Sequence, residues 1–367
     1  MSAWPPLPPL SVGEFAPVFN APTRVNPKFH FNTVAGRYVL LGFLPRDARA
    51  RAAMVADFEP HRARFDDANL VAFFVASDAE TIAAAQDRVP GQRWFFDPDG
   101  RIGRLYGALE ADGTERPYWL LTDPMLRVLD RATPDEAGPF FERLARLPPK
   151  ELDAGMPLVA PVAIVPRVFE PDLCKRLISI YEDQGGKVSG VMRDIGGKTV
   201  GVVDRMKSRR DAQIEDENLQ LLILNRLRRR LVPEIIRALQ FEATRVERYI
   251  VACYDADEGG YFRPHRDNET FATLHRRFAV SINLNAEDFE GGDLRFPEFG
   301  PRTYRPPTGG AVVFCCSLQH EATPVTKGRR YAFLPFLYDE EGKRIRDENS
   351  ALLDEETQTT PLKSTLA

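Results

Sequence analysis

A proline-rich stretch near the middle of the chain separates two different patterns of apolar residues. The segment "ARLPPKELDAGMPLVAPVAIVPRVF" (145–169) holds five prolines and no sustained periodicity, which is typical of a connection between domains. The chain has 367 residues, more than one hydrophobic core usually organises. We therefore expect two domains, residues 1–150 and 151–367, with the core of the second at about 160–340.

The first half of the chain alternates short apolar runs with a helical one. "YVLLGFL" (38–44) and "LVAFFVA" (70–76) are apolar and bounded by polar residues, as buried strands are. The segment between them has helical composition. Strand, helix and strand in this order predict a parallel sheet with covering helices, so we expect the first domain to be α/β.

The second half begins with a helical pattern and continues with strands. Apolar residues recur at helical spacing over 218–239, and the basic run "RLRRR" within it is most simply the solvated face of that helix. Five strand candidates separated by turn residues follow, at 245–254, 276–285, 291–297, 309–316 and 329–338. Such a series predicts a mainly-β sandwich or jelly roll.

Composition and charge argue against several kinds of partner. The net charge of −4 gives no electrostatic reason to bind nucleic acid. No stretch approaches the roughly 18 consecutive apolar residues of a membrane span, and the first residues do not resemble a secretory signal. Four cysteines in a chain of this length give no disulfide framework. We expect a cytoplasmic protein with no nucleic-acid or membrane partner.

A histidine and an aspartate stand two positions apart in "YFRPHRDNET" (261–270). If this segment is a strand, His265 and Asp267 project from the same face. A third ligand must come from elsewhere, and His320 follows the apolar run 309–316, whose end can approach the start of an earlier strand in a jelly roll. Two histidines and one carboxylate form the facial triad of non-haem Fe(II) oxygenases, which leaves three coordination positions open.

Other interpretations of these histidines remain. The HxD triplet alone is a weak signal, and a lone His320 would by default be a hydrogen-bonded structural histidine. His275 is the competing ligand, but Arg276 and Arg277 follow it, which is a poor setting for a divalent cation. We interpret His275 as a residue of the surface or of the layer behind the ligands.

Basic residues follow the last of these histidines. Lys327, Arg329 and Arg330 lie within ten positions of His320. A dianionic co-substrate such as 2-oxoglutarate needs a cation for its distal carboxylate, and arginine suits that task through bidentate pairing. A plain surface role fits Lys327 well, but it fits Arg330 less well because Arg330 opens a strongly apolar strand.

Four motifs in order extend these observations to a family. They are "VACYDADEGGYFRPHRDN", "RRFAVSINLN", "EGGDLRFPEFG" and "TGGAVVFCCSLQHEATPVTKGRRYAFLPFLY". On these motifs, residues 165–340 resemble the prolyl 4-hydroxylase-like branch of the Fe(II)/2-oxoglutarate-dependent oxygenases. The resemblance implies a double-stranded β-helix (jelly roll) with flanking helices, and iron held by His265, Asp267 and His320.

The same resemblance assigns the co-substrate. It implies that Arg330, ten positions beyond His320, pairs with 2-oxoglutarate, with Arg329 as the rival by one position. Tyr254 matches a tyrosine that touches 2-oxoglutarate in relatives. The implied cofactors are Fe(II), 2-oxoglutarate as co-substrate and O2, with ascorbate as an optional addition.

The first half resembles a second family. Residues 11–22, 38–52, 71–78, 94–108 and 116–129 follow the order of motifs in peroxiredoxins, so most of residues 10–148 resembles a thioredoxin-fold domain of that family. A peroxiredoxin needs a thiolate nucleophile, yet no cysteine precedes Cys174. The resemblance thus implies a scaffold without its chemistry, used for docking, for homodimer formation, for substrate gating or only as structure. It also makes the Arg116–Pro117 bond a candidate cis peptide.

The resulting hypothesis is an Fe(II)- and 2-oxoglutarate-dependent hydroxylase of unactivated C–H bonds. Its substrate would be a peptidyl residue (proline foremost), a free amino acid or a small metabolite. The alternative is a module that senses O2 or iron, or binds another protein, without turnover. The segment 201–216 is a candidate for choosing the substrate; its Arg209 and Arg210 either meet an acidic substrate or lie in solvent, and we favour solvent.

Overall fold

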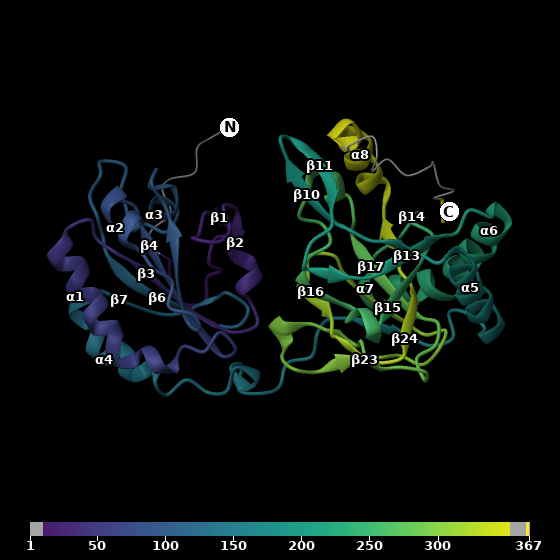
Figure 1. Cartoon of the computed structure of the whole chain (residues 1–367), viewed down its shortest axis with the longest axis horizontal. Coiled ribbons are helices and arrows are strands. Elements are labelled where there is room, and N and C mark those ends of the chain that lie inside the picture. The colour runs from purple at the N-terminus through teal and green to yellow at the C-terminus, as the bar shows by residue number, and fades with distance from the viewer. Residues whose placement is uncertain (1–9, 353–364, 367) are drawn as a thin grey trace. The chain divides into compact units, whose positions relative to one another are not determined.

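The computed structural model describes residues 10–352 and 365–366. They form two compact units, each with β-sheets of its own (Figure 1). The first unit runs to Val159 and includes Pro297–Pro301, and the second unit comprises the rest of the chain from Ala160 onward. None of the helices in the described residues combines the length and the apolar character that crossing a membrane requires.

The first unit is built on a five-stranded mixed sheet in the order β5-β4-β3-β6-β7. Strands β3, β4 and β5 are parallel, whereas β6 and β7 are antiparallel to their neighbours. The helix α1 (Ala48–Phe58) lies between β3 and β4 in the chain, so the predicted strand–helix–strand order is confirmed. The strands of this unit are β1 (Asn20–Ala21), β2 (Phe29–His30), β3 (Tyr38–Phe43), β4 (Leu70–Ala76), β5 (Gln92–Phe96), β6 (Tyr118–Thr122) and β7 (Val128–Ala132).

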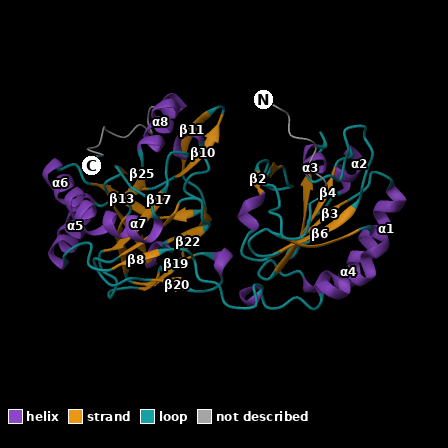
Figure 2. Ribbon diagram, turned by 180° about the vertical axis from the view of Figure 1, so that it is seen from behind, coloured by secondary structure: helices purple, strands orange, loops and turns teal. Residues whose placement is uncertain are grey.

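Both faces of this sheet are covered. Along β3, Leu41 packs in one apolar cluster with Ile102 of α3 (Arg101–Leu105), and Leu40 packs in another with residues of α1 and α4 (Ala137–Leu144). Figure 2 places α1 and α4 together along one side of the sheet. A short helix α2 (Ala79–Ala84) follows β4. Burial on both faces explains why the strands are continuous apolar runs and do not alternate.

The expectation of a cis bond at Arg116–Pro117 is wrong. Among the described residues the cis peptide bond is Val89–Pro90. The backbone N–H of Arg116 donates to the carbonyl of Ala108 at 2.8 Å as the chain enters β6. The bond before Pro117 is the ordinary trans form, which is lower in energy than cis by about 0.5–1 kcal/mol before proline.

The second unit contains a large antiparallel sheet of nine strands. All five strand candidates of the second half contain strands, four of them in this sheet. The main path is β14-β25-β17-β24-β15-β13-β9, and β21 pairs with both β17 and β8. The strands are β8 (Ala163–Val165), β9 (Lys187–Val188), β13 (Arg210–Gln213), β14 (Arg245–Glu247), β15 (Ile250–Asp255), β17 (Phe278–Asn283), β21 (Ala311–Cys315), β24 (Arg329–Phe333) and β25 (Phe336–Tyr338).

A smaller antiparallel sheet faces the large one. Its order is β12-β16-β22-β19-β20. Side chains of both sheets share one apolar cluster, in which Tyr254 comes from the large sheet and Ala322 from the small one. Two facing antiparallel sheets are the arrangement that the series of strands predicts. The strands are β12 (Lys207–Ser208), β16 (Tyr261–His265), β19 (Leu294–Arg295), β20 (Thr303–Tyr304) and β22 (His320–Ala322), with the separate pairs β10 (Val191–Ile195) and β11 (Lys198–Val202), and β18 (Glu290–Gly291) and β23 (Val325–Lys327).

Helices cover the outer face of the large sheet. They are α5 (Pro171–Gln184), α6 (Glu217–Arg226) and α7 (Val232–Leu239), and α8 (Glu340–Asn349) follows the last strand. The predicted helix over 218–239 is interrupted by one π-helical turn, Leu227–Leu231, which contains all of the basic run except Arg226. That run is not purely a solvated face: Arg226 and Arg230 both pair with Glu170, at 3.0 and 2.6 Å.

Candidate metal centre

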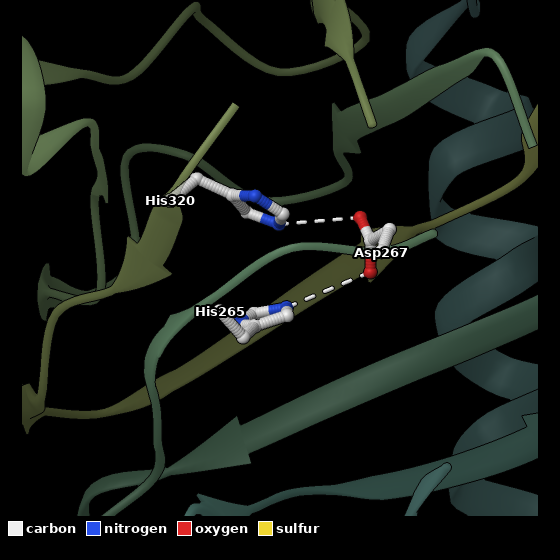
Figure 3. Close-up of side chains that lie close together, drawn as sticks. All are labelled: His265, Asp267 and His320. Atoms are coloured by element: carbon white, nitrogen blue, oxygen red, sulfur yellow. Dashed lines mark ion pairs between the residues drawn. The ribbon is translucent and has the colours of Figure 1, made fainter. Parts of the chain in front are cut away.

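Three side chains predicted as metal ligands lie together in the second unit (Figure 3). Strand β16 ends at His265 and β22 begins at His320, and these two residues are directly opposite each other in the antiparallel pair β16–β22. Asp267 follows His265 by two positions, and its backbone N–H donates to the carbonyl of Cys316 at 3.0 Å. Strand pairing therefore brings together residues that are 55 positions apart in the sequence.

The ligand atoms converge on one point. Nε2 of His265 lies 3.6 Å from Oδ1 of Asp267, and Nε2 of His320 lies 3.3 Å from Oδ2. One nitrogen or oxygen atom from each residue lies within 4.8 Å of the others. The side chains of all three are largely buried. Two nitrogens and one carboxylate at these separations match the donor set of a facial triad.

The tautomer of each histidine is fixed by its backbone. Nδ1 of His265 is 2.7 Å from the carbonyl oxygen of Arg263, and Nδ1 of His320 is 3.0 Å from that of Leu318. A carbonyl oxygen only accepts hydrogen bonds, so in the neutral ring Nδ1 carries the hydrogen and Nε2 keeps a lone pair. This hydrogen bond to the far ring nitrogen also orients metal-binding histidines in general.

The charge state of His265 suits a metal ligand. Burial and the neighbouring His320 lower the pKa of His265 to about 4, so the ring is neutral at neutral pH. In the tautomer that the backbone carbonyls set, the Nε2 of each histidine directs a lone pair toward a carboxylate oxygen of Asp267. Lone pairs facing one another repel, and a cation between them would turn the repulsion into attraction. The three residues therefore fit a metal ion.

His275 is not a ligand in this geometry, and it does not lie at the surface. The side chain is buried, with Nε2 2.7 Å from Oε2 of Glu247. Arg276 also binds Glu247, with Nη2 2.6 Å from Oε1, and its Nη1 donates to the backbone carbonyl of Asp267 at 3.3 Å. Burial disfavours the charged form of Glu247, but Arg276 and His275 outweigh the effect of burial and hold the pKa of Glu247 well below the usual range. A buried carboxylate needs such partners, which explains why this histidine faces inward.

A pocket opens between the two sheets beside the triad. Both sheets contribute side chains to its wall. It is lined by Arg209, Arg248, Tyr254, Phe262, His265, Asp267, Ala279, Val280, Ser281, Leu294, Phe314, His320, Ala322, Arg330, Leu334, Pro335 and Phe336. Mostly apolar walls with a few charged groups are typical of small-molecule sites.

Arg330 and Arg329 lie on opposite sides of β24. Arg330 is 3% exposed, donates from Nη2 to Ser281 Oγ at 2.8 Å and stands over the ring of Tyr254, 5.2 Å from its centroid. Arg329 has a side chain that is 51% exposed and pairs with Asp255 at 2.6 Å. Neighbours along a strand face opposite ways, so only Arg330 reaches the pocket.

Two further arginines reach the pocket. Arg209 is buried, contrary to the expectation that it lies in solvent: its Nη2 is 2.6 Å from Asp211 and its Nη1 is 3.4 Å from the hydroxyl of Tyr254. Arg210 faces the other way and pairs with Glu258 at 3.0 Å. The two are consecutive in the chain, with Arg209 just before β13 and Arg210 its first residue. Nothing in the sequence had marked Arg248.

A family model matches the part of the chain that holds this site. Residues 249–338 match the 2OG-Fe(II) oxygenase superfamily. This segment is a 2-oxoglutarate-dependent dioxygenase domain. The superfamily implies Fe(II), 2-oxoglutarate and O2 as cofactors. The matched residues include Tyr254, the three residues of the triad, and Arg330.

Curated relatives match part of the chain. A PKHD-type hydroxylase from Synechococcus sp. (strain JA-2-3B'a(2-13)) is 25% identical over 158 residues, which are 39% of this chain and 63% of that protein. Procollagen-lysine,2-oxoglutarate 5-dioxygenase 1 from Rattus norvegicus is 27% identical over 176 residues, 46% of this chain and 23% of that enzyme. The match thus spans less than two thirds of the length of either relative.

Two solved structures are similar to parts of this chain at low TM-scores. A prolyl hydroxylase from Trichoplax adhaerens, in complex with a hypoxia inducible factor peptide fragment, has a TM-score of 0.38 at 19% identity, over 56% of this chain and 93% of that one. A thiol peroxidase from Chromobacterium violaceum has a TM-score of 0.32 at 16% identity, over 38% of this chain and 88% of that one.

Proposed function

We propose that the chain is an Fe(II)- and 2-oxoglutarate-dependent dioxygenase that hydroxylates an unactivated C–H bond. Its substrate would be a peptidyl residue (proline foremost), a free amino acid or a small metabolite. One observation carries the proposal: two histidines, a carboxylate and a buried arginine share a single pocket. The first three suit Fe(II), and the arginine suits the far carboxylate of a dianionic co-substrate.

Each residue of the triad would have a defined role. His265 and His320 would bind iron through Nε2, because backbone carbonyls hold their Nδ1 atoms, and Asp267 would bind it through a carboxylate oxygen. Three protein ligands leave room for a keto acid and O2. The bound iron supplies the activation of O2. The apolar wall of the pocket, with Phe262, Leu294 and Phe314, would keep bulk water away from this chemistry.

Arg330 would bind the distal carboxylate of 2-oxoglutarate. Among the described residues no carboxylate pairs with it, and burial lowers the pKa of its guanidinium. A buried cation without a counter-charge is costly, and an anionic ligand would remove that cost. Tyr254 lies against Arg330 and would contact the same molecule.

The first half would be a thioredoxin-fold domain without peroxiredoxin chemistry. Residues 1–150 would form this domain, and residues 151–367 the oxygenase domain. The absence of any cysteine before Cys174 leaves the first half without a thiolate nucleophile. Such a domain would serve docking, homodimer formation or substrate gating.

Metal and co-substrate measurements on the full chain test this function. We expect about one Fe(II) per chain and iron-dependent decarboxylation of 2-oxoglutarate, with both lost in the variants His265→Ala, Asp267→Ala and His320→Ala. His61→Gln, a histidine change in the first unit, is the matched control and should leave both intact. Full activity in His320→Ala would refute the assignment of the ligands.

A product search tests turnover. Mass spectrometry across amino acids, peptides and cell extract should find a product heavier by one oxygen atom that forms only with iron, 2-oxoglutarate and O2. Binding of iron and 2-oxoglutarate without any such product would favour a sensing or protein-binding role over hydroxylation.

A further inference from the structure

The pocket carries more positive charge than iron and 2-oxoglutarate require. Arg209, Arg248 and Arg330 line it, together with a single carboxylate, Asp267; a second carboxylate, Asp211, is bonded to Arg209 behind the wall. Three arginines and two carboxylates leave an excess of one positive charge. Fe(II) and dianionic 2-oxoglutarate have equal and opposite charges, so loading the site leaves that excess unchanged.

Other charged groups near the pocket do not remove the excess. Glu247 is occupied by Arg276 and His275, and Asp293 pairs with Arg305 at 2.5 Å. Lys207 is also buried nearby, where its ammonium donates to Ser189 Oγ at 2.9 Å. It does not line the pocket, and burial, with Arg209 nearby, holds the pKa of Lys207 well below its usual range, so Lys207 offers no negative charge to offset the arginines.

Of the three arginines, Arg248 is the one that neither a carboxylate of the pocket nor 2-oxoglutarate is assigned to bind. Arg209 is paired with Asp211, and Arg330 is assigned to 2-oxoglutarate. The Nη2 of Arg248 donates to the carbonyl of Leu334 at 3.2 Å, and its guanidinium lies 4.4 Å from the ring centroid of Phe336. Its Nε is buried without a hydrogen-bond partner, and no carboxylate among the described residues pairs with it. Burial, with Arg276 and Arg209 nearby, lowers the pKa of Arg248 to about 10, so it remains a cation at neutral pH.

The backbone at Arg248 is strained. Its φ is +70°, in the left-handed region that side chains with a Cβ disfavour. Arg248 and Tyr249 form the break between β14 and β15; Tyr249 is buried in the core, while Arg248 faces the pocket. Strained residues of this kind gather at ligand-binding sites, where the surrounding structure holds them in place.

We propose that Arg248 binds a carboxylate group of the substrate, which makes the substrate a carboxylic acid such as a free amino acid or the C-terminal end of a peptide. This inference rests on the proposed function, because it concerns the third component of the same pocket. A single guanidinium pairs with a carboxylate through two parallel hydrogen bonds, and a substrate carboxylate would give Arg248 the counter-charge that it lacks among the described residues. An internal residue of a peptide would leave Arg248 uncompensated.

Binding to the Mn(II)-loaded full chain tests the proposal without turnover. With 2-oxoglutarate saturating, calorimetric titrations compare the twenty free L-amino acids with their amides, and tripeptides ending in a free carboxylate with the same tripeptide amides. We expect at least one acid to bind roughly tenfold to a hundredfold more tightly than its amide. If the acid binds more tightly than its amide only among the free amino acids, the substrate is a free amino acid. If it does so only among the tripeptides, the substrate is the C-terminal end of a peptide. If no acid binds more tightly than its amide, the proposal is wrong.

Variants assign the preference to Arg248. Arg248→Asn should abolish the difference between acid and amide, since asparagine tolerates the left-handed backbone but has no charge. Arg248→Lys should retain part of it, and Arg210→Asn, on the outer side of β13, should retain all of it. If Arg248→Asn instead loses affinity for 2-oxoglutarate, Arg248 is the co-substrate anchor and the proposal is wrong.

Failure of this inference is distinguishable from failure of the proposed function. A wild-type chain that binds Mn(II) and 2-oxoglutarate, but treats acids and amides alike, refutes only the role of Arg248. A wild-type chain that binds neither Mn(II) nor 2-oxoglutarate refutes the proposed function and, with it, this inference.

Discussion

Replacing Arg330 by methionine tests which cation binds 2-oxoglutarate. Methionine keeps an unbranched apolar side chain beside the Tyr254 ring but removes the guanidinium that donates to Ser281. Arg329→Met is the matched change one position away, on the exposed side of the same strand. Arg330→Met removes the charge on the pocket face of β24, and Arg329→Met removes the charge on its exposed face.

The structure sets the size of each effect. Arg330 is 3% exposed, so its pairing with a carboxylate would take place away from water. Removing one partner of a buried charge pair costs about 3–5 kcal/mol, which weakens binding roughly a hundredfold or more. The Arg329 side chain is 51% exposed, and exposed ion pairs contribute about 0–1 kcal/mol, or at most about fivefold.

Two measurements check this prediction. Titration of 2-oxoglutarate into the Mn(II)-loaded protein should show the large loss only in Arg330→Met, with Mn(II) affinity unchanged. Denaturant unfolding without 2-oxoglutarate should show Arg330→Met as stable as the wild type or more so, because the change removes a buried cation that has no carboxylate partner among the described residues. A large loss in Arg329→Met with none in Arg330→Met would refute the reasoning.

Three further predictions concern other parts of the molecule. Tyr254→Phe keeps the ring but loses the hydroxyl that accepts from Arg209 at 3.4 Å, so 2-oxoglutarate affinity measured by titration should fall only about fivefold. Glu247→Gln should lower the free energy of unfolding by about 3–5 kcal/mol at neutral pH. The pKa of Glu247 is depressed in the folded state, so its contribution exists above the unfolded pKa and is lost as the pH falls; the gap between variant and wild type should narrow below about pH 4.5 in unfolding curves. Full-length protein should show no thiol-dependent peroxide consumption, because the peroxiredoxin-like first half has no cysteine and burial raises the pKa of Cys174, Cys253 and Cys316, which keeps them as thiols.

Strand periodicity accounts for the part of the site that the sequence predicted. His265 ends β16 and Asp267 lies two positions further on, just beyond the strand, and the two side chains lie together as a spacing of two in extended chain predicts. His320 begins the strand that pairs with it, so its position depends only on which strands are neighbours. That neighbour relation came from the order of motifs in the sequence. These inferences need no knowledge of burial.

Burial is what the sequence did not reveal. Arg209, Arg248 and His275 stand among charged residues in the sequence, and a buried charge there has the same composition as an exposed one. Their surroundings are set by long-range partners: Asp211 and Tyr254 for Arg209, and Glu247 for His275. Arg330 could not be separated from Arg329 because "RYAFLPFLY" does not alternate; its pairing opposite Tyr254 fixes the face.

The two sheets contribute different groups to the pocket, which explains how it holds both a metal triad and several arginines. The small sheet and the loop after it supply the triad, through β16 and β22, while the large sheet supplies the cations, through β24 and the break before β15. Arginines close to Fe(II) would repel it, and placing the two sets on facing walls keeps the cations apart from the metal. A dianion long enough to bridge the walls, with one end at the metal and one at Arg330, satisfies both. Arg248 lies on the same wall as Arg330 but is not assigned to 2-oxoglutarate, so it remains available to bind the substrate.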